Sequence, residues 1–266
     1  MIKLIICGAA GRMGKRIITC AQSEEDLKVT AAVERVGHPD LGRDAGEISG
    51  VGAIQVPLTD SLEGVIRPGD VVIDFSAPGP ALVHAGIAAA SGKALVIGTT
   101  GFTPEEEDQL RETVRGIACV FSPNMSVGVN LLFKLVGKVA ETLGDDYDIE
   151  IVEAHHRFKK DAPSGTARKI ARIVADALDR DLEERVVYGR VGMTGERTRE
   201  EIGIHSIRAG DIVGDHTVIF STPGERLELT HRAHSRDTFA RGALRAARFA
   251  AGSAPGFYSM IDILEV

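Results

Sequence analysis

A glycine-rich turn near the N-terminus constrains the fold of this chain more than any other feature. The apolar run 3–7 leads directly into Gly8-Ala9-Ala10-Gly11-Arg12-Met13-Gly14, and a helical pattern follows over 13–23. Glycines at this spacing permit a tight turn, a close approach of the backbone to a pyrophosphate, and close packing of the helix on the strand. The helix N-terminus adds free N–H groups that bind an anion. The turn predicts a dinucleotide site, although Ala10 replaces the middle glycine of the common pattern.

A carboxylate after the second expected strand, 29–33, supports the same interpretation. Glu34 lies 20 residues beyond Gly14, where dinucleotide-binding units place an acid for the adenosine ribose hydroxyls. Arg35 follows at once. Because a carboxylate repels the additional phosphate of NADPH and a guanidinium attracts it, the pair predicts binding of both NADH and NADPH. A solvated strand end is the alternative interpretation of these two residues.

Apolar strands alternate with helices through the rest of the first half. We expect strands at 54–56, 71–75, 94–97 and 118–121, and helices at 80–90 and 104–114. Thr103 is the expected N-cap of the last helix, with Pro104 at its first position. This alternation predicts an α/β fold with a Rossmann-like, doubly wound parallel sheet.

Two loops that follow strands of this sheet are candidates for binding the same cofactor. They are Gly98-Thr99-Thr100-Gly101 and Ser122-Pro123-Asn124-Met125. Ligands of doubly wound sheets bind outside the carboxyl ends of the strands, and small residues there allow a nicotinamide and its ribose to approach. Taken alone, the two loops are also compatible with simple turns.

The pattern changes after about residue 130. We expect helices at 130–143 and 164–178, strands at 148–154, 201–208, 216–221 and 226–232, and a final amphipathic helix at 238–251. Three of these strands follow one another without helices, and Pro223-Gly224 predicts a turn between the last two. The second half therefore predicts an α+β domain with a mixed or antiparallel sheet. We expect domains at 1–129 and 130–236, with the helix of 237–266 packing back on the first.

The most informative stretch of the second half runs from Glu153 to Ala167. Five basic side chains lie within six positions, namely His155, His156, Arg157, Lys159 and Lys160. Their mutual repulsion is unfavourable unless an anion neutralises it, and the expected helix start at Pro163-Ser164-Gly165-Thr166 offers a second anion site. The stretch predicts a small substrate with more than one carboxylate, with histidine and lysine as proton donors.

Other interpretations of this stretch stay open. It could be a solvated loop or a nucleic-acid contact, and Glu153 could do no more than orient a histidine. The pair His155-His156 could belong to a metal site, but no nearby cysteine or well-spaced carboxylate completes one, so we predict no metal.

Composition narrows the class of protein. The net charge of −7 disfavours a nucleic-acid binder, and no stretch approaches the ~20 apolar residues that a membrane span needs. The three cysteines, Cys7, Cys20 and Cys119, are odd in number and lack metal-ligand spacing, which indicates buried thiols in a reducing compartment. The N-terminal run lacks the features of a signal peptide, so we expect a cytoplasmic protein.

Taken together, the motifs resemble the 4-hydroxy-tetrahydrodipicolinate reductase family, also called the dihydrodipicolinate reductases. The resemblance covers essentially the whole chain. It rests on the glycine-rich turn, the two loops above, Val72-Ile73-Asp74-Phe75-Ser76, the stretch 153–167, and Arg208-Ala209-Gly210-Asp211-Ile212-Val213-Gly214-Asp215-His216.

The resemblance implies roles for individual residues. His155 is expected to donate and accept a proton, Lys159 to be the catalytic lysine, and His156, Gly165 and Thr166 to bind substrate. Arg236 and Phe239 are expected to approach the cofactor from the C-terminal segment. Cofactor contacts are implied for Gly8, Ala9, Ala10, Gly11, Arg12, Met13, Glu34, Arg35, Gly98, Thr99, Thr100, Ser122, Pro123, Asn124 and Met125.

The activity implied by the resemblance is the NADH- or NADPH-dependent reduction of 4-hydroxy-tetrahydrodipicolinate to tetrahydrodipicolinate, with loss of water, in the diaminopimelate route to lysine. It also implies a homotetramer built through the sheet of the second domain, and closure of that domain, which binds the cyclic dicarboxylate substrate, over the cofactor.

Two alternatives to this activity remain. One is another two-domain NAD(P)-dependent dehydrogenase acting on an amino-acid-derived dicarboxylate; an enzyme of this kind that acts on a semialdehyde through an acyl intermediate would need a nucleophilic cysteine. The other is a non-catalytic dinucleotide-sensing module, which would not need His155 and Lys159.

Overall fold

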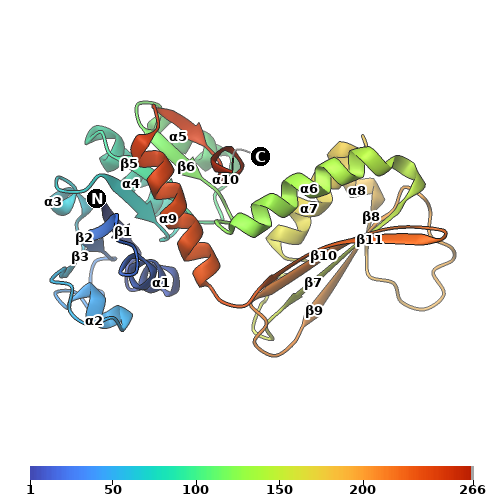
Figure 1. The fold of residues 1–266 in the computed structure, drawn as a ribbon, viewed down its shortest axis with the longest axis horizontal. Coiled ribbons are helices and arrows are strands. Elements are labelled where there is room, and N and C mark those ends of the chain that lie inside the picture. The colour runs from blue at the N-terminus through green and yellow to red at the C-terminus, as the bar shows by residue number, and fades with distance from the viewer. Residues whose placement is uncertain (265–266) are drawn as a thin grey trace. The chain divides into compact units, whose positions relative to one another are not determined.

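The computed structural model describes residues 1–264 and divides the chain into two compact units (Figure 1). The first unit comprises residues 1–127 together with the C-terminal segment from Arg236. The second unit comprises Gly128–Ser235. Within residues 1–264, no helix is both long enough and apolar enough to span a membrane.

The first unit is built on a seven-stranded sheet with the strand order β12-β6-β5-β4-β1-β2-β3, in which every pairing is parallel. Its strands are β1 (Ile2–Cys7), β2 (Leu27–Val33), β3 (Leu58–Thr59), β4 (Val71–Asp74), β5 (Ala94–Ile97), β6 (Ala118–Phe121) and β12 (Gly256–Tyr258). Its helices are α1 (Arg12–Ala21), α2 (Ala45–Ser49), α3 (Leu62–Val65), α4 (Pro78–Ala90), α5 (Pro104–Thr113), α9 (Asp237–Gly252) and α10 (Met260–Ile263). The predicted doubly wound α/β fold is confirmed.

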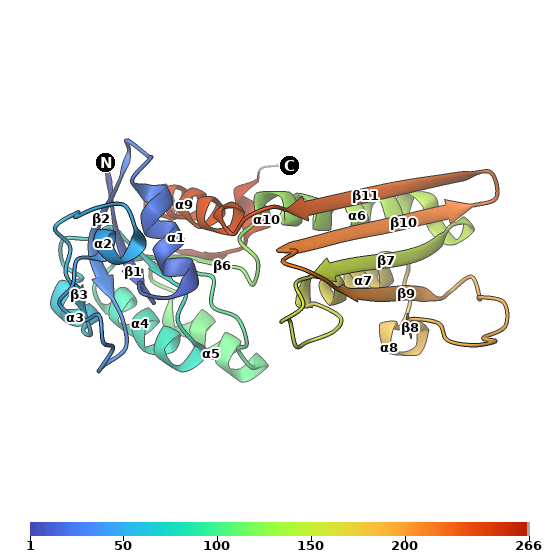
Figure 2. The ribbon, with the colours of Figure 1, turned by 90° about the horizontal axis from the view of Figure 1, so that it is seen from below.

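Both faces of this sheet are buried, as the continuous apolar strands require. Successive side chains of a strand point to opposite faces, so Leu4 and Ile6 pack in one core with α1 and α9. Ile5 and Cys7 pack in a second core with α4 and α5. Figure 2 shows α1 and α9 on one side of the sheet and α4 and α5 on the other.

The start of α5 follows the sequence prediction closely. Thr103 is its N-cap and accepts a hydrogen bond from the backbone N–H of Glu106, whose side chain accepts in return from the N–H of Thr103. Pro104 stands at the first helical position. The start of α5 therefore forms where local capping chemistry places it.

One predicted strand is wrong. Residues 54–56 form no strand, and the third strand is instead Leu58–Thr59. The physical reason is Asp44, whose carboxylate accepts hydrogen bonds from the backbone N–H groups of Ile54 and Val56. Because these groups are satisfied by a side chain, the segment needs no strand partner.

Strand β12 was not predicted from the sequence. Gly256–Tyr258 pairs in parallel with Ala118–Val120 of β6 and extends the sheet by one strand after α9. Three residues are too short a run for an alternating pattern to identify a strand.

The second unit is built on a five-stranded sheet with the order β11-β10-β7-β9-β8. Its strands are β7 (Asp148–His155), β8 (Val186–Tyr188), β9 (Ile202–Arg208), β10 (Gly214–Thr222) and β11 (Glu225–Ala233). Its helices are α6 (Val127–Leu143), α7 (Gly165–Ala177), α8 (Leu182–Arg185) and a 3₁₀ turn at Gly144–Asp146. Antiparallel pairing of β10 with β7 and β11 and parallel pairing of β9 with β7 and β8 make the sheet mixed, as predicted.

One face of this second sheet is covered and the other is open. Strand β7 alternates between buried and partly exposed residues, and its buried Ile149 and Ile151 pack with α6 and α7. Figure 2 shows these two helices behind the strands. Pro223-Gly224 forms the two-residue turn between β10 and β11 that the sequence predicts, and Gly224 has a φ of 98°.

Candidate active site

The glycine-rich turn connects β1 to α1 and leaves no room for side chains at two positions. Gly8 has a φ of 74°, and a Cβ atom there would lie 2.7 Å from the backbone oxygen of Phe75. A Cβ atom at Gly14 would lie 2.2 Å from the oxygen of Gly8. The turn is thus the close-packed cradle that a pyrophosphate requires, and the residues present fit a dinucleotide.

Glu34 lies beside this turn, beyond the end of β2. Its carboxylate accepts hydrogen bonds from the backbone N–H groups of Ala10, at 3.1 Å, and Arg35, at 3.0 Å. The side chain is therefore held at the turn rather than pointing freely into solvent. The predicted spacing between the turn and the acid brings the two together in space.

Two cavities lie at the carboxyl ends of the strands of the first unit. One, of about 550 Å³, is lined by Gly8, Gly11, Val33, Glu34, Arg35, Val36, Asp60, Phe75, Ser76, Ala77, Pro80, Val83 and His84. The other, of about 410 Å³, is lined by Arg12, Met13, Phe75, Ser76, Gly98, Thr99, Thr100, Pro123, Asn124, Met125 and Phe239. Phe75 and Ser76 line both cavities.

Most of the cofactor residues suggested by the sequence line one of these cavities, and four do not. Ala9, Ala10, Ser122 and Arg236 are absent from both linings. Ser122 is 3 % exposed and donates a hydrogen bond from its hydroxyl to the backbone oxygen of Asn124, which shapes the loop from inside. Arg236 occupies the N-cap position of α9.

Asp74 joins the loops that border these cavities. Its carboxylate is fully buried at the end of β4. It accepts hydrogen bonds from the backbone N–H and the hydroxyl of Ser76 and from the hydroxyl of Thr99, and it lies 2.6 Å from Nδ1 of His84. One acid therefore ties together the β4–α4 loop, the β5–α5 loop and α4. The sequence shows Asp74 in a family motif, but not these partners.

Cys7, Asp74 and His84 are grouped closely enough to be considered as metal ligands, with one ligand atom from each lying within 4.8 Å of the others. Hydrogen bonds already occupy both oxygens of Asp74. Burial, followed by the charges of Asp74 and Glu34, raises the pKa of the Cys7 thiol well above its ordinary value, so the sulfur is protonated. The group therefore has the chemistry of a hydrogen-bonded cluster rather than that of a thiolate metal site.

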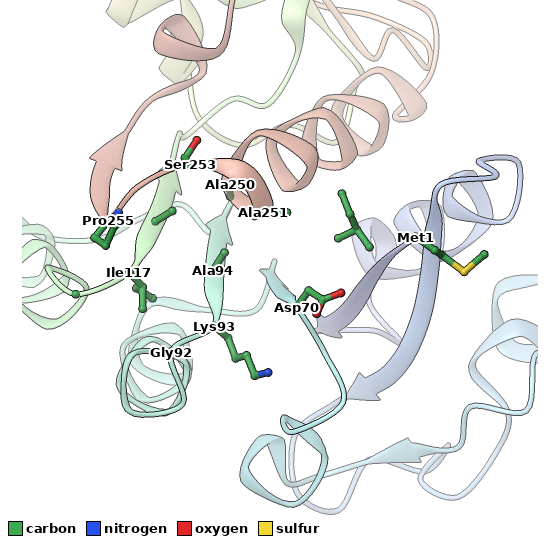
Figure 3. Close-up of a pocket in the computed structure, with 13 residues that line it drawn as sticks. Met1, Asp70, Gly92, Lys93, Ala94, Ile117, Ala250, Ala251, Ser253 and Pro255 are labelled. Atoms are coloured by element: carbon green, nitrogen blue, oxygen red, sulfur yellow. The ribbon is translucent and has the colours of Figure 1, made fainter.

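A third cavity lies at the amino ends of the strands of the same sheet (Figure 3). It measures about 460 Å³, and Ile2, Ala94 and Ala118, the first residues of three strands, contribute to its lining. None of the predicted site residues lines it. Because doubly wound sheets bind ligands at the carboxyl ends of their strands, this cavity has no part in the site.

In the second unit, the candidate site forms around Glu153, which lies on β7 and is fully buried. Its Oε2 lies 2.6 Å from Nδ1 of His155, and its Oε1 accepts from the backbone N–H of Ser164 at 3.1 Å. Arg208 donates to both carboxylate oxygens at 2.8 Å. Burial raises the pKa of Glu153, but hydrogen bonds from Arg208 and His155 outweigh burial and bring that pKa to about 2.

His155 and Lys159 both belong to this cluster. Burial lowers the pKa of His155 below its ordinary value; the Glu153 carboxylate opposes that shift, and the charge of Lys159 adds to it. Lys159 follows β7 in the loop and pairs with Asp161, with Nζ and Oδ1 2.9 Å apart. The site thus holds an imidazole and an ammonium within electrostatic reach of each other.

The N-terminus of α7 lies beside the same carboxylate. Ser164 caps the helix by accepting from the N–H of Ala167, and its hydroxyl lies 3.0 Å from Nε2 of His216. Gly165 is the first helical residue and Thr166 the second. The structure therefore places these two predicted substrate residues, with His155, around one hydrogen-bonded network.

Sequence reasoning assigned no role to Arg208 and His216. Burial, followed by the charge of His155, lowers the pKa of His216 to about 3, so this imidazole is neutral. The buried Nδ1 atoms of His156 and His216 have no hydrogen-bond partner within residues 1–264. Arg208 and His216 are the first and last residues of the run 208–216, which resembles the family. This resemblance is the feature of the sequence that could have identified them as site residues.

The two units supply different parts of a reaction. The first has a glycine-rich turn with Glu34 held beside it on a parallel sheet, and the second has an imidazole and an ammonium in the cluster beside a helix N-terminus. This combination defines an NAD(P)H-dependent oxidoreductase of the two-domain class. The chain belongs to the dihydrodipicolinate reductase family, whose N-terminal model matches residues 2–125 and whose C-terminal model matches residues 128–264.

Individual relatives agree with this assignment. The chain is 52 % identical over 264 residues to the 4-hydroxy-tetrahydrodipicolinate reductases of Syntrophus aciditrophicus and Citrifermentans bemidjiense. The alignments cover 99 % of this chain and 98 % and 99 % of those proteins. A solved structure of dipicolinate-bound dihydrodipicolinate reductase from Paenisporosarcina sp. TG-14 matches with a TM-score of 0.76 and 25 % identity, covering 97 % of both chains.

Proposed function

We propose that this chain carries out the reaction of its family with His155 and Lys159 as the proton-donating groups. The reaction is the NADH- or NADPH-dependent reduction of 4-hydroxy-tetrahydrodipicolinate to tetrahydrodipicolinate, with loss of water, in the diaminopimelate route to lysine. The observation that carries the proposed roles is the buried Glu153 carboxylate, which holds Nδ1 of His155 at 2.6 Å and leaves Nε2 for a substrate.

Loss of the 4-hydroxyl as water leaves a conjugated C=C–C=N system in the substrate ring. NAD(P)H, when bound, supplies a hydride to carbon 4 of that system. The electron pair displaced by the hydride is shared between the neighbouring ring carbon and the nitrogen, and a proton added to that carbon restores the C=N bond of tetrahydrodipicolinate. The imidazolium of His155 delivers that proton from Nε2, and the charge of Lys159 stabilises the developing anion before the transfer.

The substrate's carboxylates are held by the start of α7. Backbone N–H groups at Gly165 and Thr166 are at the first turn of that helix, where the helix dipole favours an anion. His156 adds a ring nitrogen, its buried Nδ1, which has no hydrogen-bond partner in the part of the chain that the structure describes. Fixing a carboxylate in this way fixes the ring relative to His155.

In the first unit, the glycine-rich turn would hold the cofactor's pyrophosphate, and Glu34 and Arg35 would read the adenosine ribose. The loops at Gly98–Thr100 and Ser122–Met125 would border the nicotinamide. We assign dinucleotide binding to this unit, and substrate binding and oligomerisation to the second. A homotetramer formed through the sheet of the second unit and a cytoplasmic location complete the proposal.

Buried thiols argue against the semialdehyde alternative. Cys7 and Cys119 lie in strands, Cys20 lies in a helix, and all three are buried. Burial raises the pKa of each thiol, in Cys119 to about 12. None of them has the exposed, low-pKa environment that a nucleophilic cysteine needs.

A steady-state assay of NADH and NADPH oxidation tests the proposal directly. The substrate supplied is 4-hydroxy-tetrahydrodipicolinate. We expect oxidation that depends on both the substrate and the chain. Tight binding of NADH without turnover would support the sensing module instead.

A further inference from the structure

We infer that Glu153 is a positioning residue that orients His155 and, through the same carboxylate, fixes the substrate-binding end of α7. This inference rests on the proposed function, because it takes His155 to be the proton donor. It adds a residue outside the set proposed to touch substrate or cofactor.

The first part of the argument is the number of donors that Glu153 accepts. Two contacts with Arg208, one with the backbone N–H of Ser164 and one with Nδ1 of His155 converge on its two oxygens. A buried carboxylate is stable only when donors replace the water it has lost. With Arg208 donating to each oxygen, only a carboxylate can accept at both positions.

This arrangement sets the orientation of the His155 ring. Because Glu153 accepts from Nδ1–H, the other ring nitrogen, Nε2, is the one that can carry a proton to a substrate. Nε2 lies toward Gly214 of β10, where a Cβ atom would be 3.1 Å from it. The lack of a side chain at Gly214 keeps the space beside Nε2 open.

The same carboxylate determines where α7 begins. Ser164 donates its backbone N–H to Oε1 of Glu153 and caps the helix with its hydroxyl. Since that hydroxyl already accepts from Ala167, its own hydrogen is free to bond Nε2 of the neutral His216. One acid therefore fixes the distance between the proton donor and the helix end that binds a carboxylate.

The groups that face His155 come from several elements. Glu153 lies on its own strand, Lys159 on the following loop, Arg208 on β9, and His216 on β10 with its ring centroid 5.2 Å away. Lys159 and Arg208 are positively charged and oppose protonation of His155, whereas His216 is neutral. Glu153 is the acid among them, so its charge is what keeps an imidazolium accessible.

The substitution Glu153→Gln tests this role, with Glu150→Gln as the matched control. In either orientation of the glutamine amide, its NH₂ group replaces an oxygen that accepts from Arg208, so two donors face each other. In the orientation that places the NH₂ group at the position of Oε2, it also faces Nδ1 of His155. Glu150 lies on the same strand and contacts Arg190 and His205 in the same manner, away from the site. Both substitutions remove one negative charge from β7.

We expect Glu153→Gln to lower kcat about 10²-fold or more and to raise KM for the dicarboxylate substrate. The upper limb of the kcat–pH profile should move to lower pH, because the imidazolium loses its counter-charge. NADH affinity should stay unchanged, and Glu153→Asp should restore much of the pH profile. Wild-type kcat and pH profile in Glu153→Gln, or equal effects in Glu150→Gln, would overturn the inference.

A second measurement needs no substitution and no turnover. In the ¹⁵N NMR spectrum of the wild-type chain, neutral His155 should carry its hydrogen on Nδ1. The opposite tautomer overturns the positioning role even if Glu153→Gln fails to fold. If the tautomer is as expected but the wild-type chain does not oxidise NADH or NADPH with substrate, the proposed function fails and the positioning geometry stands.

Discussion

His155 Nδ1 lies 2.6 Å from Oε2 of Glu153, a carboxylate with no exposed surface. This pairing connects two consecutive inward-facing residues of β7, so an alternating strand supports the proposed proton donor. The strand's geometry thus determines which ring nitrogen can reach a substrate.

Removing either proposed proton donor should reduce turnover without reducing cofactor binding. We expect His155→Ala and Lys159→Ala each to lower kcat about 10²- to 10⁴-fold, the range found for general acids. Neither residue belongs to the first unit, so NADPH affinity measured by fluorescence titration should match the wild type. Lys138→Ala, an exposed lysine of α6, is the control. Normal kcat at saturation combined with lost cofactor binding would refute these roles.

Asp74→Asn should weaken binding of both nucleotides. The asparagine NH₂ would face donors from Ser76, Thr99 or His84, so the two cofactor loops would lose a common anchor. We expect about a 10-fold rise in the Kd of NADH and NADPH and a loss of about 1–3 kcal/mol of unfolding free energy. Asp70→Asn, at the other end of the same strand, is the control. Unchanged Kd values would show that the loops hold their shape without Asp74.

Arg35→Ala should discriminate between the two cofactors. A charge-assisted contact with the 2′-phosphate contributes about 1.5–3 kcal/mol, or roughly 10- to 10²-fold in kcat/KM for NADPH. kcat/KM for NADH should change little, because the proposed contact with the ribose hydroxyls is made by Glu34. Arg43→Ala, an exposed arginine paired with Asp40, controls for the loss of charge. Equal losses for both cofactors would mean that Arg35 acts on the fold rather than on the phosphate.

Acid should destabilise the second unit in a way that His216 and Glu153 explain. Burial lowers the pKa of His216 from its ordinary 6.5 to about 3 in the folded state. Between these two pH values the unfolded state therefore binds a proton at this histidine that the folded state does not bind. The free energy of unfolding falls as the pH drops from 6.5 towards 3. The pKa of Glu153 is also lowered, to about 2, so its contribution is lost as pH falls from 4.5 towards 2.

Urea midpoints at pH 7, 5 and 4 measure this dependence. We expect His216→Gln to be less stable than the wild type at pH 7 but to lose less stability on acidification. His234→Gln, an exposed histidine of the same unit, should retain the wild-type slope. Parallel pH profiles for the wild type and His216→Gln would contradict the assigned titration.

Local chemistry made much of the first unit predictable. The glycine-rich turn, the Thr103 cap and the alternation of apolar strands with helices are each encoded within a few residues. The predicted strand at 54–56 is wrong for a reason that is also close in the chain. The backbone N–H of Ile54 donates to the carboxylate of Asp44, ten residues upstream. Propensity does not reveal such a contact.

The second unit's network was less accessible to sequence reasoning. His155 and Lys159 stand in a dense basic run that invites a functional interpretation. Arg208 is 55 positions from Glu153, and His216 is 52 positions from Ser164. Arg208 and His216 reach the cluster around Glu153 only because β9 and β10 pair with β7. Residue type alone does not reveal this pairing.

A crystal structure with NADPH and pyridine-2,6-dicarboxylate tests the central claim most directly. The account predicts that Nε2 of His155 and Nζ of Lys159 face the dicarboxylate ring across from the nicotinamide, with a carboxylate at the N-terminus of α7. A complex in which both side chains point away from the nicotinamide, with the dicarboxylate bound elsewhere, would contradict it.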